Sequence, residues 1–199
     1  HSAPYTIAGV ADANIAGGNL SLSSSVNPTT SAGQYGFKVS ETGTPSLANS
    51  ITEGYYIQFT VVAASGFDFS ISSIEWKGGS TTSGADNIAL LSDVKGFTDG
   101  NEIAAFADVG TDGGYDATIS SGSFDSSYNN LTSITFRVYG WNISGSSGRT
   151  NFRSLSGDDL IINGTTAVSA VPEPSTYPLI FGAATLSYVM YRRCTKRVS

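Results

Sequence analysis

The segment from Tyr55 to Val62 constrains the fold most, because its residues alternate strictly between two faces. The first face carries Tyr55, Ile57, Phe59 and Val61. The second face carries Tyr56, Gln58, Thr60 and Val62. Successive side chains of a strand point to opposite sides, so this period of two predicts a β-strand with one buried face.

A second strand is predicted over Leu131–Tyr139, with Ile134, Phe136 and Val138 facing inward. Shorter apolar runs fill the rest of the chain up to residue 165, separated by breaks rich in Gly, Ser and Asn. Hydrophobic residues make up 40% of the chain, which can supply a core. We therefore predict an all-β fold, a jelly-roll-like β-sandwich over residues 1–165.

The segment Phe67–Ile71 repeats the alternation after a Ser-Gly turn, which predicts a hairpin with Tyr55–Val62. The alternation then slips by one residue at Ser72-Ser73, before Trp76. A slip of one residue within a strand predicts a β-bulge. Trp76 is expected in the core.

Charge is unevenly distributed along the chain. Through residue 171 there are 6 basic and 15 acidic residues, a balance of −9, whereas residues 192–199 hold four basic residues and no acidic one. An acidic body repels phosphates, so we expect no nucleic-acid partner. The single cysteine, Cys194, lies in the basic tail, so no disulfide or cysteine-based metal site is expected in the body.

The composition changes after residue 165. Residues 166–176 form a predicted linker that contains Pro172-Glu173-Pro174, and two prolines around a glutamate predict an extended, exposed peptide. Residues 177–199 are predicted as a single hydrophobic helix with a basic tail that begins at Arg192-Arg193.

This order of a Pro-Glu-Pro motif, an apolar helix and a basic stop resembles the PEP-CTERM sorting signal of Gram-negative bacteria. The residues that carry the resemblance are Pro172, Glu173, Pro174, Arg192 and Arg193, with the apolar stretch between them. The resemblance implies an exosortase as partner, a transient anchor in the inner membrane, and then release or attachment at the cell surface.

The length of the apolar stretch fits a temporary membrane stop. A comfortable bilayer span takes about 17–25 apolar residues, and the run from Pro178 to Tyr191 is shorter. The arginines are expected on the cytoplasmic side. Two alternatives remain: a permanent single-pass anchor, and a helix that packs on a soluble core.

The body is similar, more loosely, to ectodomains that precede this signal. The resemblance rests on Tyr55–Val61, Ile88–Phe97 and Ile134–Gly140. Such proteins commonly carry Ser-Val-Asp-Gly-Phe in the middle segment, where this chain reads Asp-Val-Lys-Gly-Phe over Asp93–Phe97. The resemblance implies a jelly-roll-like sandwich and association with the surface or the biofilm matrix, without a particular ligand.

Two groups of residues are candidates for a binding site. Asp108, Asp112 and Asp116 recur every four residues beside two glycines; solvated turn aspartates explain them best, with a Ca²⁺ site as the alternative, and no other cofactor is expected. Tyr139 and Trp141, on the side opposite Phe136, and Tyr115 offer aromatic faces that could stack on sugar rings.

The sequence marks no catalytic residue. Its only histidine is His1, which argues against a histidine-based triad, and we predict that the protein is not an enzyme. We expect an exported structural or adhesive protein of the cell surface or extracellular matrix, processed at its C-terminus by an exosortase. The alternative is a carbohydrate-binding module that acts on exopolysaccharide.

Overall fold

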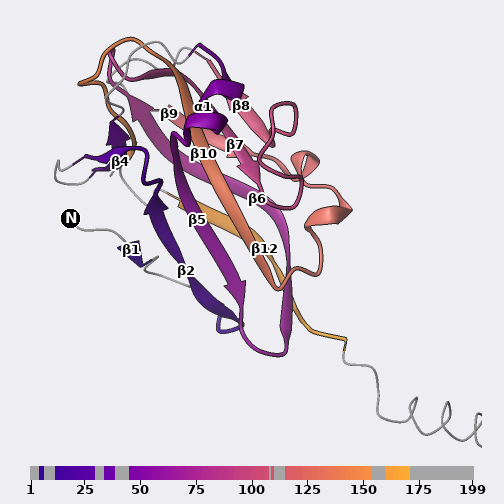
Figure 1. Cartoon of the computed structure of the whole chain (residues 1–199). Coiled ribbons are helices and arrows are strands. Elements are labelled where there is room, and N and C mark those ends of the chain that lie inside the picture. Colours follow the sequence, from indigo (N-terminus) through magenta and orange to yellow (C-terminus); the bar gives the residue numbers. More distant parts are fainter. Residues whose placement is uncertain are drawn as a thin grey trace, which may run out of the picture. The chain divides into compact units, whose positions relative to one another are not determined.

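The computed structural model (Figure 1) describes residues 5–6, 12–29, 34–38, 45–107, 109, 115–153 and 160–170. Its strands are β1 (Tyr5–Thr6), β2 (Ile15–Leu22), β3 (Asn27–Pro28), β4 (Gln34–Lys38), β5 (Tyr56–Ala63), β6 (Phe67–Ser80), β7 (Ala85–Ser92), β8 (Ala104–Phe106), β9 (Tyr115–Ile119), β10 (Ser133–Ile143), β11 (Thr150–Arg153) and β12 (Leu160–Val168). Its helices are α1 (Leu47–Glu53) and two single 3₁₀ turns, Ser121–Ser123 and Ser126–Tyr128. The predicted all-β class is confirmed.

The strands form two sheets. The first sheet has the order β1-β2-β5-β10-β7-β8, and the second has the order β12-β6-β11-β4-β3. Strand β9 also pairs with β6, on the side away from β12. Every recorded strand pair is antiparallel. Neighbours such as β5, β10 and β7 are far apart in the sequence, so long-range pairing builds the middle of the first sheet, whereas β1-β2, β3-β4 and β7-β8 are consecutive pairs.

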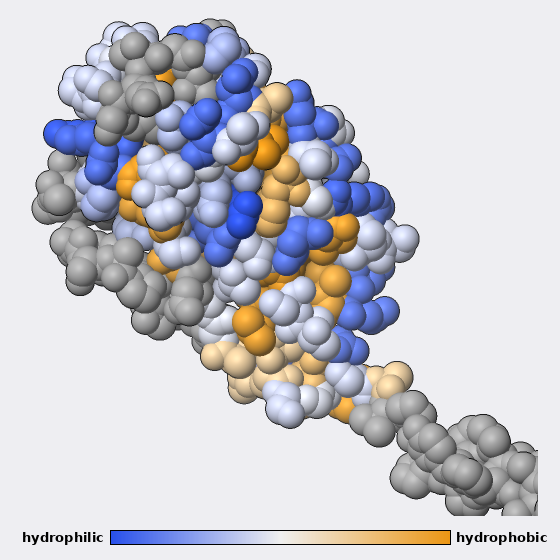
Figure 2. All heavy atoms as spheres, viewed as in Figure 1, coloured by the Kyte–Doolittle hydropathy of each residue, from blue (hydrophilic) through white to orange (hydrophobic). Residues whose placement is uncertain are grey.

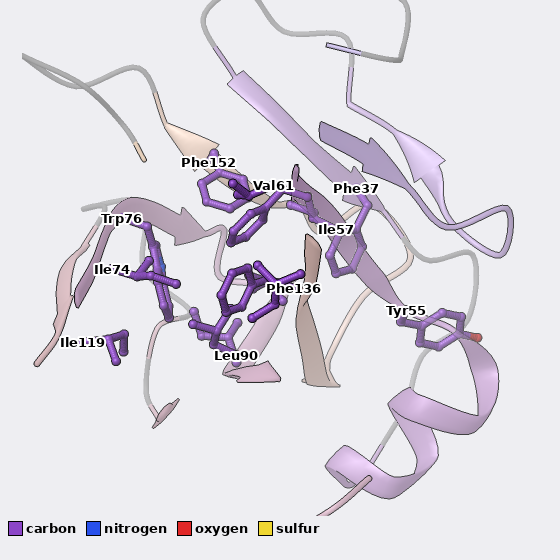
Figure 3. Packing of buried hydrophobic residues seen from close by; sticks show 14 of the residues in the cluster. Phe37, Tyr55, Ile57, Val61, Ile74, Trp76, Leu90, Ile119, Phe136 and Phe152 are labelled. Carbon is purple, nitrogen blue, oxygen red and sulfur yellow. The ribbon is translucent and has the colours of Figure 1, made fainter. Parts of the chain in front are cut away.

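One hydrophobic core lies between the two sheets (Figure 3). The rings of Phe59 and Phe136, from neighbouring strands of the first sheet, stack with centroids 5.0 Å apart. Phe152, from the second sheet, meets Phe59 edge-on at 6.5 Å. Trp76 is 2% exposed, as predicted. The predicted inward face of Leu131–Tyr139 is confirmed as well, because Ile134, Phe136 and Val138 are all buried.

The predicted hairpin between β5 and β6 is wrong, because the two strands belong to different sheets. Both edges of β5 are already paired, one with β2 and the other with β10, which leaves no place for β6 beside it. The turn at Ala64–Gly66, with Gly66 at φ +83°, carries the chain across the core instead. Phe59 and Phe69 can therefore bury their side chains in the same core from opposite sheets.

The predicted bulge in β6 is confirmed. In the pairing with β12, Ser73 lies opposite Asn163 and Ile71 lies opposite Gly164, so Ser72 has no partner. The extra residue brings Ile74 back to the buried face. Gly164 is required at this point, since a Cβ there would clash with the backbone carbonyl oxygen of Ser70.

The folded unit extends further than the sequence indicates. Strand β12 continues to Val168, so the predicted boundary at residue 165 falls inside a strand rather than in a linker. Residues up to Val168 form one compact unit.

The predicted hydrophobic helix over 177–199 lies outside the described residues. Among the residues that are described, no helix has the length and hydrophobicity for a membrane crossing. On the face drawn in Figure 2, apolar residues occur in several places among hydrophilic ones.

Candidate functional site

The outer face of the first sheet, turned away from the common core, gathers aromatic side chains around one arginine. We call Tyr56, Gln58, Phe97, Arg137 and Tyr139 the Arg137 cluster. The residues come from β5, from β10 and from the loop after β7. The pairing of β5 with β10 places Arg137 opposite Gln58 and Tyr139 opposite Tyr56. The sheet register therefore places four of the five residues next to one another.

Helix α1 covers one end of this face (Figure 1). The Ser46 side chain accepts a hydrogen bond from the Asn49 N–H at 3.3 Å and so caps the helix, and Gly54 ends it at φ +76°. The buried Ser50 hydroxyl donates to the Gly140 carbonyl of β10 at 2.7 Å. Leu47, the first residue of the helix, packs with Tyr139 in a second buried group. These contacts hold α1 against the sheet.

The loop after β7 brings Phe97 to the cluster. Gly96 adopts φ +83°, which favours glycine and turns the chain just before Phe97. The Asn101 side chain donates to the Lys95 carbonyl at 2.6 Å, and Asp93 accepts from the Thr135 N–H of β10 at 3.0 Å. The segment singled out at Asp93–Phe97 is therefore a compact turn that is tied to the sheet.

The guanidinium group of Arg137 lies between two aromatic rings. Its Cζ is 4.2 Å from the ring centroid of Tyr56 and 4.0 Å from that of Phe97. Its Nε donates to Gln58 Oε1 at 2.9 Å, and one Nη1 hydrogen is directed at the Tyr139 hydroxyl, 3.3 Å away. Aromatic faces attract cations within about 6 Å, so these contacts fix the orientation of the group.

No carboxylate neutralises Arg137 in the part of the chain that the structure describes. A guanidinium has five N–H donors. Two of them have partners in Gln58 and Tyr139, and the remaining three have none among the described residues. The one ion pair recorded there joins Lys95 to Asp125 at 2.6 Å. Arg137 is half-buried rather than enclosed, so its spare donors are available to a ligand.

Tyr139 does not offer the exposed ring that the sequence suggests. It lies on the side opposite Phe136, as expected, but its exposed fraction is 0% because α1 and its neighbours cover it. Its ring meets that of Tyr56 edge-on, with centroids 5.3 Å apart. Burial raises the pKa of the Tyr139 phenol, and the hydrogen bond from Arg137 only partly opposes this. Tyr139 therefore supports the cluster and cannot stack on a sugar.

The two other predicted aromatic residues lie apart. Trp141 is half-buried on the same outer face as Tyr139 and remains a candidate for contact with a ligand. Tyr115 belongs to β9, where it pairs with Gly78 of the second sheet. Tyr115 therefore belongs to the second sheet, whereas Tyr139 and Trp141 belong to the first.

The predicted Ca²⁺ ligands are only partly described. Asp108 and Asp112 lie outside the described residues, and Asp116 is in strand β9, opposite Lys77, rather than in a loop. Within the described ranges, no three acidic, histidine or cysteine side chains come together as a metal site. The Ca²⁺ alternative stays a prediction.

The proposed sorting residues also lie outside the described part. This applies to Pro172, Glu173, Pro174, Arg192 and Arg193. Comparison of the chain with protein-family models, curated proteins and solved structures found no match.

Sequence reasoning named the segments that contain Arg137 and Phe97 but predicted no binding role for either residue. The available signal was a charged residue at an outward position of a predicted strand, two positions from Tyr139. That pattern commonly marks a solvated strand face, because the sequence does not reveal which loop lies over it. The loop that carries Phe97 places an aromatic ring over the Arg137 guanidinium group, which a fully solvated arginine would lack.

Proposed function

We propose that this chain is an exported structural or adhesive protein of the cell surface or extracellular matrix, and that an exosortase processes its C-terminal sorting signal. The observation that carries the proposal is the order of Pro172-Glu173-Pro174, an uncharged apolar run and Arg192-Arg193. The inner membrane holds the chain only until it is processed, and the protein is not an enzyme.

The position of the last strand supports this reading. Strand β12 ends at Val168, four positions before Pro172. The buried residues of the core that the structure describes lie between Val26 and Phe152, and Ile162 of β12 packs against them. Cleavage near the motif therefore leaves the compact unit complete. We also propose a jelly-roll-like sandwich for this unit, since antiparallel strands that are distant in sequence lie side by side in each sheet.

Intact mass tests the sorting proposal. Protein recovered from the envelope and medium of its native host is expected to lack everything after the Pro172–Pro174 region. Replacing Pro172, Glu173 and Pro174 together by alanine is expected to abolish this cleavage and to retain the full mass. Pro178→Ala is the matched control, because it removes a proline from the same segment but outside the motif. It is expected to leave processing intact.

A wild-type mass that extends to Ser199 in the envelope would show a lasting anchor, and the exosortase proposal would then fail. Equal processing of the motif variant and the Pro178→Ala control would have the same consequence.

The Arg137 cluster favours a second function, namely binding of exopolysaccharide. Three guanidinium donors that have no partner among the described residues lie between two aromatic rings, with the partly exposed Trp141 on the same face. Guanidinium groups pair well with carboxylates, and aromatic faces suit the apolar faces of sugar rings. We propose that a matrix polysaccharide with uronic acid units binds here. Asp93, bound to the Thr135 N–H of the same strand, limits the affinity for such a polyanion.

Calorimetry with a polyuronate tests this binding. We expect wild-type protein to bind alginate oligosaccharides more tightly than neutral dextran, and the binding to weaken as salt is raised. Arg137→Gln is expected to weaken alginate binding about tenfold or more, because a hydrogen bond to a charged group contributes about 1.5–3 kcal/mol. Lys38→Gln on β4 of the second sheet removes the same charge elsewhere and is the control.

Two results would contradict glycan binding. One is the absence of heat with alginate and with other matrix polysaccharides. The other is equal weakening by Arg137→Gln and Lys38→Gln, which would reflect net charge alone. Thermal melting of both variants verifies that they fold.

A further inference from the structure

Strand β12 is an outer strand with an exposed edge. It pairs with β6 alone, and within the described ranges nothing pairs with its other side. Six of its nine residues are exposed, among them Ile161 at 36% and Val168 at 73%. Its sequence, LIINGTTAV, contains no charged residue and no proline. Charges, prolines and short length are the usual means by which proteins protect a sheet edge from pairing.

The other outer strands of the two sheets are protected in these ways. Strand β1 has two residues and β8 has three. Strand β3 has two residues, one of which is Pro28. Strand β9 has five and carries Asp116. Among the outer strands that the structure describes, β12 is therefore the long one without such protection.

The hydrogen bonds around Phe69 show which backbone groups of β12 face outward. Phe69 exchanges both of its backbone hydrogen bonds with Leu131, at 2.8 and 2.9 Å, on the side of β6 away from β12. Phe69 and Thr166 therefore form a non-hydrogen-bonded pair, in which the N–H and C=O of Thr166 point away from β6. Because the pattern repeats every second residue, the same holds for Gly164 and Val168.

We propose that two copies of this chain join through their β12 edges as antiparallel strands, which continues the second sheet across both molecules. An antiparallel pair of identical strands has two-fold symmetry, so the same edge serves both partners. The strand itself supports a second copy as the occupant, because LIINGTTAV carries no charged residue, so two copies of it can lie side by side without like charges facing each other across the pair. The balance of −9 up to residue 171 opposes the approach of two copies through their charged surfaces, and β12 is an uncharged strand. The inference goes beyond surface sorting and glycan binding and depends on neither.

The side-chain contacts at this strand leave its edge open. Thr166 accepts a hydrogen bond from the Asn14 side chain and donates one to Asp12, both at 3.0 Å. Asn163 donates to Ser73 and Glu75 of β6. All of these bonds use side chains of β12, so no bond among the described residues occupies the outward backbone N–H and C=O groups.

Sedimentation velocity of the full chain over a concentration series tests the proposal. A Cys194→Ser background excludes disulfide dimers, and a non-ionic detergent covers the apolar tail. Thr166→Pro removes an outward N–H together with the hydroxyl, whereas Thr166→Ala removes only the hydroxyl. We expect the parent chain and Thr166→Ala to form dimers, and Thr166→Pro to raise the dimer dissociation constant about tenfold or more, a loss of about 1.4 kcal/mol.

Val168→Pro and its control Val168→Ala repeat the comparison at an exposed position without side-chain hydrogen bonds to lose. In the parent chain, hydrogen exchange at the Thr166 amide is expected to slow as the concentration rises. A chain that stays monomeric at every concentration overturns the proposal. So does equal association of the proline and alanine variants when melting shows that all of them fold.

Discussion

Replacing Phe136 by alanine lowers the free energy of unfolding by about 3–5 kcal/mol, the range for removing a buried aromatic side chain. Phe136 is 0% exposed and lies at the centre of the core (Figure 3), where its ring stacks on Phe59 at 5.0 Å. The edge-on contact of Phe59 with Phe152 extends the same packing to the second sheet. The cavity left by the substitution therefore weakens the contact between the sheets as well as the first sheet itself.

Urea unfolding followed by tryptophan fluorescence measures this loss, because Trp76 is buried in the same core. The melting temperature is expected to fall by roughly 6–20 °C for a domain of this size. Ser133→Ala is the control, since Ser133 lies on the same strand and is exposed. Its expected effect is within about 0.5 kcal/mol. A Phe136→Ala protein as stable as the control would show that the two sheets do not share one core.

Alanine in place of Gly148 destabilises the protein by about 3 kcal/mol or more, at the upper end for overpacking. A Cβ on Gly148 would overlap the backbone of Ser83 and Gly84. The two segments cross here and are held by backbone hydrogen bonds, from Gly145 N–H to the Ser83 carbonyl and from Thr81 N–H to the Arg149 carbonyl, both at 3.0 Å. A rigid backbone cannot move aside as a flexible side chain does, so the two crossing segments must move apart to make room for the new Cβ.

Gly122→Ala is the matched comparison for Gly148→Ala. The nearest atom to its new Cβ would be Ser120 Oγ at 3.7 Å, an ordinary van der Waals contact. Without a clash, alanine restricts the unfolded chain and is expected to raise stability by about 0.4–1 kcal/mol. Thermal melts of the two variants should therefore shift in opposite directions. If Gly148→Ala melts at or above the wild type, the close crossing at Ser83 is not present.

Sequence patterns predicted the strands but not their partners. The alternation in Tyr55–Val62 and the slip at Ser72 are local features, and both are present in the structure. Pairing is not local, because it depends on which edges are already occupied. The hairpin expected between β5 and β6 does not form, since β2 and β10 occupy both edges of β5.

The candidate site likewise has some features that the sequence predicted and others that only the fold determined. The sequence placed Tyr139 and Trp141 on the face opposite Phe136, which follows from the period of two. It did not reveal α1, a helix of seven residues with a Ser46 cap and a Gly54 end, because so short a helix has little periodicity. The fold placed α1 over Tyr139 and Phe97 over Arg137, which buried the expected sugar contact and produced the clamped arginine.

By itself, the sequence determined the β class, the inward faces of the main strands and the bulge at Ser72, because each depends on neighbouring residues only. Tertiary structure alone decided the sheet order, the covering of Tyr139, the setting of Arg137 and the place of β12 as an outer strand of the second sheet. These depend on contacts between segments that are far apart in the chain, and such contacts leave no periodic pattern in any one of them.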